Sequence, residues 1–184
     1  EKRYTRISKI ARTKDKDAVY ELAILDKIKE TLEAGKSART IEFTPEEEVY
    51  VKNLFLLTTK PVLYVANISE EDVIAGGDNE MVKIVRDFAA TEGAEVVTVC
   101  ARIEEEVAEL DDEEKAEFLS ELGIEQSGLD QLIQKAYTLL GLGTYFTAGE
   151  KEVRAWTFRL GMKAPQTAGI IHSDFERGFI RAET

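Results

Sequence analysis

The sequence contains almost none of the residue types from which disulfide-stapled, zinc-bound or membrane-spanning proteins are built. Among its 184 residues there is one cysteine, Cys100, and one histidine, His172. One cysteine excludes an internal disulfide framework and fits a reducing compartment, and one of each excludes an ordinary Cys/His zinc site. No apolar run approaches the roughly 20 residues that a membrane helix needs. We therefore expect a cytoplasmic protein with no membrane partner.

Positive charge is the scarcer sign, and it is unevenly distributed. The chain carries 24 Lys and Arg against 36 Asp and Glu, a formal net charge of −12. Residues 1–40 have a net charge of +4, whereas residues 41–143 have −17. An acidic surface repels phosphate, so we expect neither general nucleic-acid binding nor a DNA partner.

The basic residues at the start fall on one side of an expected helix. Arg3, Arg6 and Lys9 follow one another at three-residue steps. Lys2, Arg6 and Lys9 form an equivalent stripe at steps of four and three. Such a stripe can contact RNA locally, and the alternative interpretation is a solvated helix face.

The first third of the chain has helical periodicity. Apolar residues recur every three or four positions through residues 1–34, with a polar interruption at 13–17, which predicts a helical hairpin that ends at Gly35. Thr44 and Pro45 are a typical N-cap and first residue of a third helix, which we expect to reach about Leu57. Its expected packing residues are Val49, Leu54, Phe55 and Leu57.

The middle of the chain predicts a β-α-β unit. Two nearly continuous apolar strands, 61–67 and 95–100, are separated by an amphipathic helix over 78–92, which is typical of a parallel pair. Further elements follow beyond it. We expect helices over 103–110, 112–122 and 129–140, a boundary at 141–143, a strand over 152–158, a helix over 164–172 and a strand beginning at 179–183.

No segment matches the phosphate-binding loop of nucleotide hydrolases. Gly35-Lys36-Ser37 resembles the end of that loop, but the glycine required five positions earlier is replaced by Glu30. The tripeptide also follows a helix, whereas the loop must join a strand to a helix. The residues that hold phosphates are therefore absent from these 184 residues.

The end of the first apolar strand is the most informative candidate site. Ligands of open α/β sheets bind beyond the carboxyl ends of parallel strands, where this chain has Asn67-Ile68-Ser69-Glu70. Guanine-binding proteins have Asn-Lys-x-Asp there, and the Asp accepts hydrogen bonds from both N1–H and the 2-amino group. Ile68 and Glu70 replace that Lys and Asp, so guanine preference should be lost. The alternative is a structural turn in which Ser69 or Asp72 caps a helix.

Three other residue types give weaker signals. Cys100-Ala101 ends the second strand, where a small-residue loop can offer a backbone N–H to a base, although Cys100 is also typical of a buried structural thiol. His172 is more consistent with a structural or RNA-facing role than with a general base. Trp156 lies in an alternating strand and is expected in the core.

Several longer motifs together resemble the YchF or Obg-like ATPase family, and the resemblance extends over essentially the whole chain. The residues that carry it are KPVLYVANISE (60–70), AELDDEE (108–114), TYFTAG (144–149), EVRAWT (152–157), APQTAG (164–169) and IHSDFERGFI (171–180).

The resemblance implies an α/β fold with three parts. Residues 1–58 would be a helical coiled-coil insertion, 59–143 the C-terminal part of a P-loop GTPase-like domain with a parallel sheet, and 144–184 part of a β-grasp TGS domain. Asn67, Ile68 and Glu70 would line an adenine site, with Cys100-Ala101 as the last loop that faces the base. The phosphate-binding loop, both switch segments and the residue that activates water would precede residue 1, leaving this chain without hydrolytic activity by itself.

The resemblance also implies a function. It predicts an ATPase that uses Mg²⁺ with ATP and associates with ribosomes or ribosomal RNA. The alternatives are a GTP-preferring GTPase, which the absent Lys and Asp argue against, and a non-catalytic module that binds RNA or protein.

Overall fold

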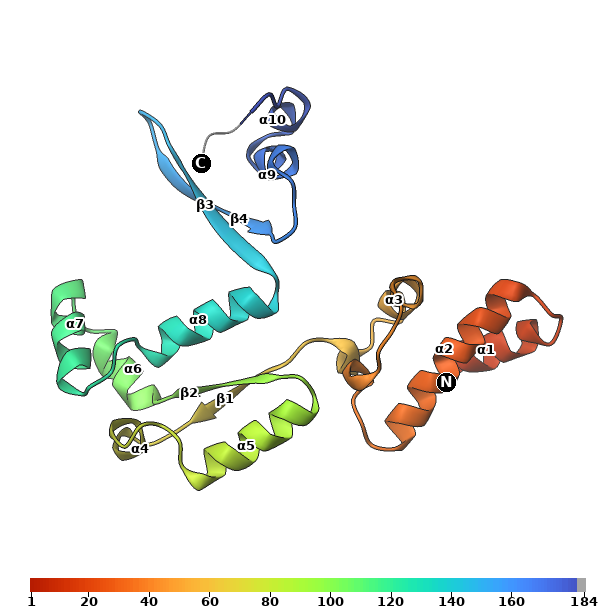
Figure 1. Ribbon diagram of the computed structural model, residues 1–184, viewed down its shortest axis with the longest axis horizontal. Helices are drawn as coiled ribbons and strands as arrows, with labels where there is room; N and C mark the ends of the chain where they lie inside the picture. Colours follow the sequence, from red (N-terminus) through yellow and green to blue (C-terminus); the bar gives the residue numbers. More distant parts are fainter. Residues whose placement is uncertain (182–184) are drawn as a thin grey trace. The chain divides into compact units, whose positions relative to one another are not determined.

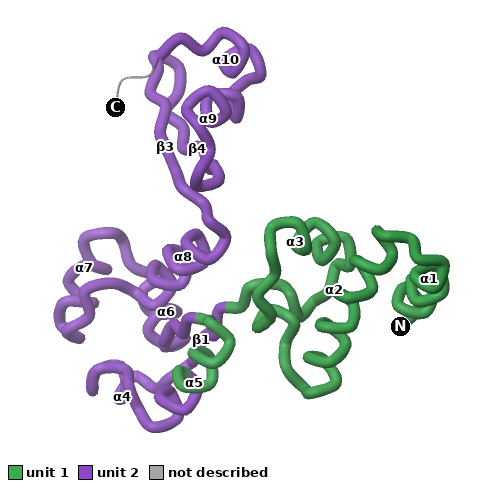
Figure 2. The backbone as a smooth tube through the Cα atoms, turned by 45° about the vertical axis from the view of Figure 1, so that its right-hand side comes forward, with its two compact units in different colours: residues 1–62, 86–94 green, residues 63–85, 95–184 purple. Residues whose placement is uncertain are grey.

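The computed structural model describes residues 1–181 and divides the chain into two compact units (Figure 2). Unit 1 comprises residues 1–62 and 86–94, and unit 2 comprises residues 63–85 and 95–184. The expected three-part division at residues 58 and 143 remains a prediction.

Unit 1 begins with the predicted helical hairpin, α1 (Lys2–Ala11) and α2 (Lys16–Glu33) (Figure 1). Asp15 caps α2 by accepting a hydrogen bond from the Ala18 N–H. Gly35 follows with φ +72°, the left-handed conformation that favours glycine after a helix, as predicted. The hairpin buries Ile7, Ala18 and Leu25 between its two helices.

The third helix, α3 (Pro45–Lys52), begins as predicted but is shorter than expected. Thr44 and Glu47 form a reciprocal capping box, and Glu47 also accepts a hydrogen bond from Lys27 Nζ at 2.6 Å. Those contacts lower the pKa of Glu47, with the Lys27 hydrogen bond as the largest cause. The helix stops before Leu57 because Phe55 has φ +50°.

The packing expected for α3 was wrong at three of four positions. Phe55 is 87% exposed, and Val49 and Leu57 are also exposed. Only Leu54 packs on the core cluster, which is built from Ile24, Ile28, Ala38 and Val51. The short 3₁₀ turns η1 (Ala38–Thr40) and η2 (Leu57–Thr59) complete this part of the unit.

Unit 2 contains the predicted parallel strand pair, β1 (Leu63–Asn67) and β2 (Glu95–Val99). Their register runs from Leu63 opposite Glu95 to Asn67 opposite Val99, so both strands end at the same edge. The connection contains the short helix α4 (Glu70–Ile74) and the longer α5 (Glu80–Thr91). The β-α-β prediction is confirmed.

Three helices follow β2, close to the predicted positions: the acidic α6 (Ala101–Val107) and α7 (Asp112–Glu121), and then α8 (Gly128–Leu139). Cys100, Ile103, Val107 and Leu119 form a core shared by α6 and α7. The start of α8 approaches β2 closely, because a Cβ on Gly128 would lie 3.1 Å from the Val99 Cα. The side chain of Glu104 also accepts a hydrogen bond from the Gly128 N–H at 2.7 Å.

The last part of unit 2 is an antiparallel hairpin, β3 (Leu142–Ala148) and β4 (Val153–Arg159), followed by α9 (Ala164–Ile171) and α10 (Ser173–Arg177). Tyr145 Oη donates to the Thr167 carbonyl at 2.9 Å and so ties β3 to α9. β3 was not predicted. Of the strand expected to begin at 179–183, residues 179–181 are not in a strand and the rest lies outside the described residues.

Candidate nucleotide-base site

The candidate site is formed where β1 and β2 end together. Asn67 is the last residue of β1 and pairs with Val99, the last residue of β2. The Ile68 N–H extends the pairing by donating to the Val99 carbonyl at 2.9 Å. The two segments that the sequence selected, 67–70 and 100–101, are therefore brought together at one edge.

Asn67 joins the two segments directly. Its Oδ1 accepts a hydrogen bond from the Ala101 N–H at 3.1 Å. This bond fixes the Asn67 side-chain amide. It also occupies the Ala101 N–H, the backbone donor that was expected to contact a base. In this structure Asn67 and Ala101 therefore shape the loop together.

Glu70 is the first residue of α4, and the residue before it caps that helix. Ser69 Oγ accepts from the Asp72 N–H at 3.2 Å and donates to Asp72 Oδ2 at 2.7 Å. The second bond is the largest cause that lowers the pKa of Asp72. The predicted Ser69 cap is thus present, and it leaves the Glu70 side chain free for other partners.

The partner of Glu70 is a residue that the sequence analysis missed. Arg102 Nε lies 3.9 Å from Glu70 Oε2 and 3.5 Å from Glu106 Oε1. Arg102 directly follows Cys100-Ala101 and has an acidic residue four positions later, which is the signal that could have identified it.

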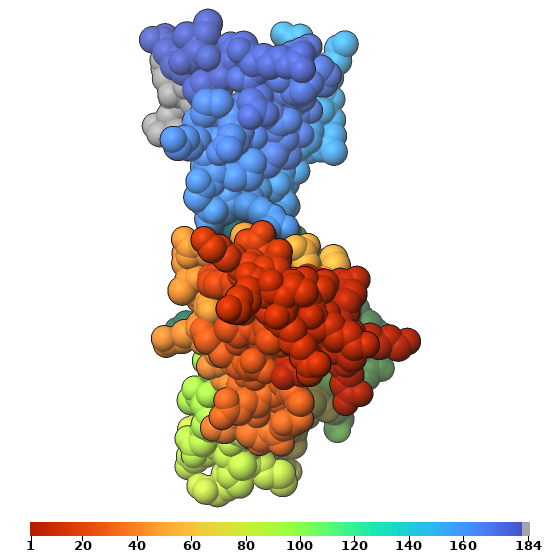
Figure 3. Space-filling model, turned by 90° about the vertical axis from the view of Figure 1, so that its right-hand side faces the viewer, coloured from red at the N-terminus to blue at the C-terminus, as the bar shows by residue number. Residues whose placement is uncertain are grey.

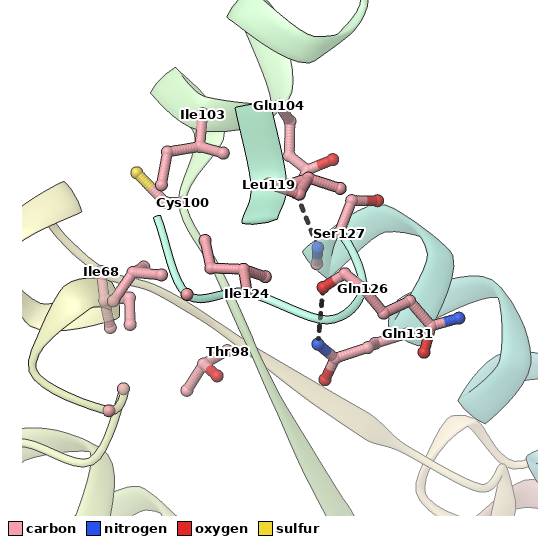
Figure 4. A pocket seen from close by; sticks show the side chains of 15 residues that line it. Ile68, Thr98, Cys100, Ile103, Glu104, Leu119, Ile124, Gln126, Ser127 and Gln131 are labelled. Atoms are coloured by element: carbon pink, nitrogen blue, oxygen red, sulfur yellow. Dashed lines mark hydrogen bonds between the residues drawn. The ribbon is translucent and has the colours of Figure 1, made fainter. Parts of the chain in front are cut away.

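Ile68 and Cys100 line a different space from Asn67 and Glu70. They contribute to a cavity of about 290 Å³ closed by Ile103, Leu119 and Ile124 (Figure 4). The Cys100 thiol is buried and belongs to the helical core, which supports the structural interpretation of this residue. Of the five predicted residues, Ile68 and Cys100 therefore line this cavity, whereas Asn67, Glu70 and Ala101 do not.

His172 and Trp156 have local structural partners. His172 Nδ1 accepts from the Asp174 N–H at 3.2 Å and caps α10. Trp156 Nε1 donates to Thr147 Oγ1 at 2.9 Å, and the Arg154 guanidinium stacks 4.1 Å from the indole centroid.

The basic stripe of α1 is divided by an ion pair. Arg3 Nε donates to Glu21 Oε1 at 2.5 Å, so Arg3 is used within the hairpin. Lys2, Arg6 and Lys9 are exposed on α1, which is red in Figure 3. The stripe of Lys2, Arg6 and Lys9 is therefore better placed for an external contact than the one that includes Arg3.

Two absences apply to the described part of the chain. Within residues 1–181, no helix combines the length and hydropathy needed to cross a membrane. Over that same range, no group of three or more His, Cys, Asp and Glu side chains is arranged to hold a metal ion.

Comparison with known proteins decides the family. Residues 142–184 match the family model YchF-GTPase_C, described as "Protein of unknown function (DUF933)". Over 184 residues the chain is 65% identical to the "Ribosome-binding ATPase YchF" of Bacillus subtilis (strain 168), covering 100% of this chain and 50% of that protein. The chain belongs to the YchF family.

Further YchF proteins agree with this assignment. The "Ribosome-binding ATPase YchF" of Haemophilus influenzae is 50% identical over 183 residues, again with 100% of this chain and 50% of the relative covered. The solved structure of the Schizosaccharomyces pombe YchF GTPase superposes with a TM-score of 0.79 at 36% identity, covering 90% of this chain and 44% of the other. The chain thus spans about half the length of these YchF relatives.

Proposed function

We propose that the protein is an ATP-binding and ATP-hydrolysing member of the P-loop GTPase superfamily that associates with ribosomes in the cytoplasm. The observation that carries the proposal is the Asn67-x-x-Glu70 pair at the shared end of two parallel strands. The names of the B. subtilis and H. influenzae relatives support both the ATPase activity and the ribosome partner.

Base selection follows from the chemistry of Glu70. Guanine presents two adjacent donors on its pairing edge, N1–H and the 2-amino group, whereas adenine presents one, its 6-amino group. The Glu70 carboxylate, held near Arg102, can accept from a single amino donor. Ile68 lacks the ammonium of the usual Lys and offers an apolar surface, so the site loses its means of recognising guanine.

Hydrolysis would be completed by groups other than those described above. Phosphoryl transfer in this superfamily depends mainly on positioning and on neutralising phosphate charge. Mg²⁺ would supply part of that neutralisation when it enters with ATP. The residues present here orient the base, and the helical hairpin and the β3–β4 module would provide contacts to the ribosome.

Affinity for the two nucleotides tests the proposal. In the full-length protein that carries this sequence, calorimetric titration should give tighter binding of ATP than of GTP. The double change Ile68→Lys with Glu70→Asp should restore guanine binding, because it recreates the two-point acceptor and its covering Lys. Equal or tighter GTP binding by the unchanged protein contradicts the proposal.

A GTP-preferring enzyme is the second candidate, because the S. pombe structure carries the name GTPase. The same titration separates the two candidates. If GTP is preferred, the Ile68→Lys and Glu70→Asp changes should add little to an affinity that is already high.

A further inference from the structure

The first two residues of α6 reach both ends of the Asn-x-x-Glu motif. The Ala101 N–H donates to Asn67 Oδ1 at 3.1 Å. The next residue, Arg102, places its Nε 3.9 Å from Glu70 Oε2. The start of α6 therefore contacts the motif at both Asn67 and Glu70, once through a backbone hydrogen bond and once through a side-chain ion pair.

Arg102 has a second acidic neighbour that fixes its direction. Glu106 lies one helical turn further along α6, and its Oε1 is 3.5 Å from Arg102 Nε. Both distances are measured from Nε, so the guanidinium lies within ion-pair range of the two carboxylates at once. Glu106 anchors Arg102 on α6 while the same guanidinium faces Glu70.

We propose that Arg102 is a positioning residue that strengthens the choice of adenine by attracting one oxygen of the Glu70 carboxylate through an ion pair. This inference rests on the proposed function. Because Arg102 attracts Oε2, Oε1 is the freer acceptor for a base, which matches the single amino donor of adenine. Guanine needs both oxygens for its two donors, so Arg102 opposes it.

The side-chain exposures limit the size of the effect. Arg102 is 74% exposed and Glu70 is 40% exposed, so solvent screens their attraction. Pairs of this kind change an equilibrium by about two- to fivefold. Arg102 thus adjusts a selectivity that Glu70 and Ile68 establish.

The test measures ATP and GTP affinity of the full-length protein by calorimetry. In Arg102→Met, the ratio of the GTP dissociation constant to the ATP dissociation constant should fall about two- to fivefold, because Glu70 regains both acceptor oxygens. Arg102→Lys should recover part of the ratio. Lys83→Met is the matched control, since Lys83 is an exposed cationic residue on α5 that pairs with Glu80 outside the motif.

Two outcomes overturn the inference. An unchanged ratio in Arg102→Met does so, and so does equal weakening of both nucleotides, which would indicate only a structural role. A double-mutant cycle compares the effects of Arg102→Met, Glu70→Gln and the double variant on nucleotide binding free energy. If the two single effects add up to the double effect, the side chains are not coupled, whichever nucleotide is preferred. A parent protein that binds GTP as tightly as ATP overturns the proposed function alone, and the cycle then decides on Arg102.

Discussion

Gly128 is a residue whose missing side chain lets α8 begin against β2. A Cβ there would lie 3.1 Å from the Val99 Cα and 3.2 Å from the Thr98 carbonyl oxygen. Both neighbours are backbone atoms of a paired strand, so they cannot move aside as a side-chain tip would. The tight contact places the start of α8 against the end of β2, immediately before Cys100 and Ala101.

Gly128→Ala should therefore destabilise the protein. Replacing glycine by alanine gains about 0.4–1 kcal/mol from the unfolded state. Overpacking against backbone costs about 1–3 kcal/mol, so the net change should be a loss of stability. The measurement is the urea midpoint of unfolding.

Gly149→Ala is the matched control for this prediction. Its added Cβ would meet nothing closer than the Glu152 carbonyl oxygen at 3.8 Å, an ordinary van der Waals distance. This variant should unfold slightly above the parent midpoint, because it keeps the unfolded-state gain without the overpacking cost. A Gly128→Ala protein as stable as Gly149→Ala would show that β2 and α8 separate easily.

The sequence predicted Asn67 and Glu70 but not the residue that contacts Glu70. Asn67 and Glu70 could be selected as candidates because strand ends and motif spacing are local properties of the chain, and their contact with a base remains a prediction. The approach of Arg102 to Glu70 depends on the register of β1 against β2, which places two separate segments side by side. Single-sequence spacing contains no direct information about that register.

At the scale of elements, helix starts were predicted more accurately than helix ends. Thr44 and Pro45 predict the start of α3, whereas no Gly or Pro indicates its end at Lys52. The strand β3 was missed because Gly141 and Gly143 suggested a boundary. Gly143 instead lies inside the strand, where a Cβ would be 2.7 Å from the Phe158 ring of the paired residue. Cross-strand packing thus determined the role of that glycine.

The α1–α2 hairpin carries the prediction about ribosome binding. Changing Lys2, Arg6 and Lys9 to Glu should weaken co-sedimentation with ribosomes and lower the slope of log affinity against log salt by about 2 to 3, since each phosphate contact releases counterions. Arg3 is left unchanged because it pairs with Glu21 and supports the hairpin itself. ATP affinity of the full-length protein should not change.

The control for the hairpin changes Lys52, Lys60 and Lys83 to Glu. It alters the net charge by the same amount but leaves α1 intact, so ribosome binding should decrease less than in the α1 variant. If the α1 variant sediments like the parent at every salt concentration, the basic stripe is a solvated face.

At the scale of the whole molecule, these 184 residues should bind no phosphate chain tightly. The sequence contains no G-x-x-x-x-G-K-[ST] motif, whose amides and Lys hold the β- and γ-phosphates. We predict no ATPase activity from the 184-residue chain by a phosphate-release assay. Activity that remains constant through successive purification steps would contradict this prediction.

The parallel pairing of β1 and β2 also has a consequence for the order in which the chain is made. The α1–α2 and β3–β4 hairpins join neighbouring segments, so each can form as soon as it leaves the ribosome. β1 cannot pair until β2 has been synthesised about thirty residues later, a delay on the order of seconds at ordinary elongation rates. During that interval its apolar residues are a target for chaperones, and the edge formed by Asn67 and Val99 becomes the last part of the β-α-β unit to assemble.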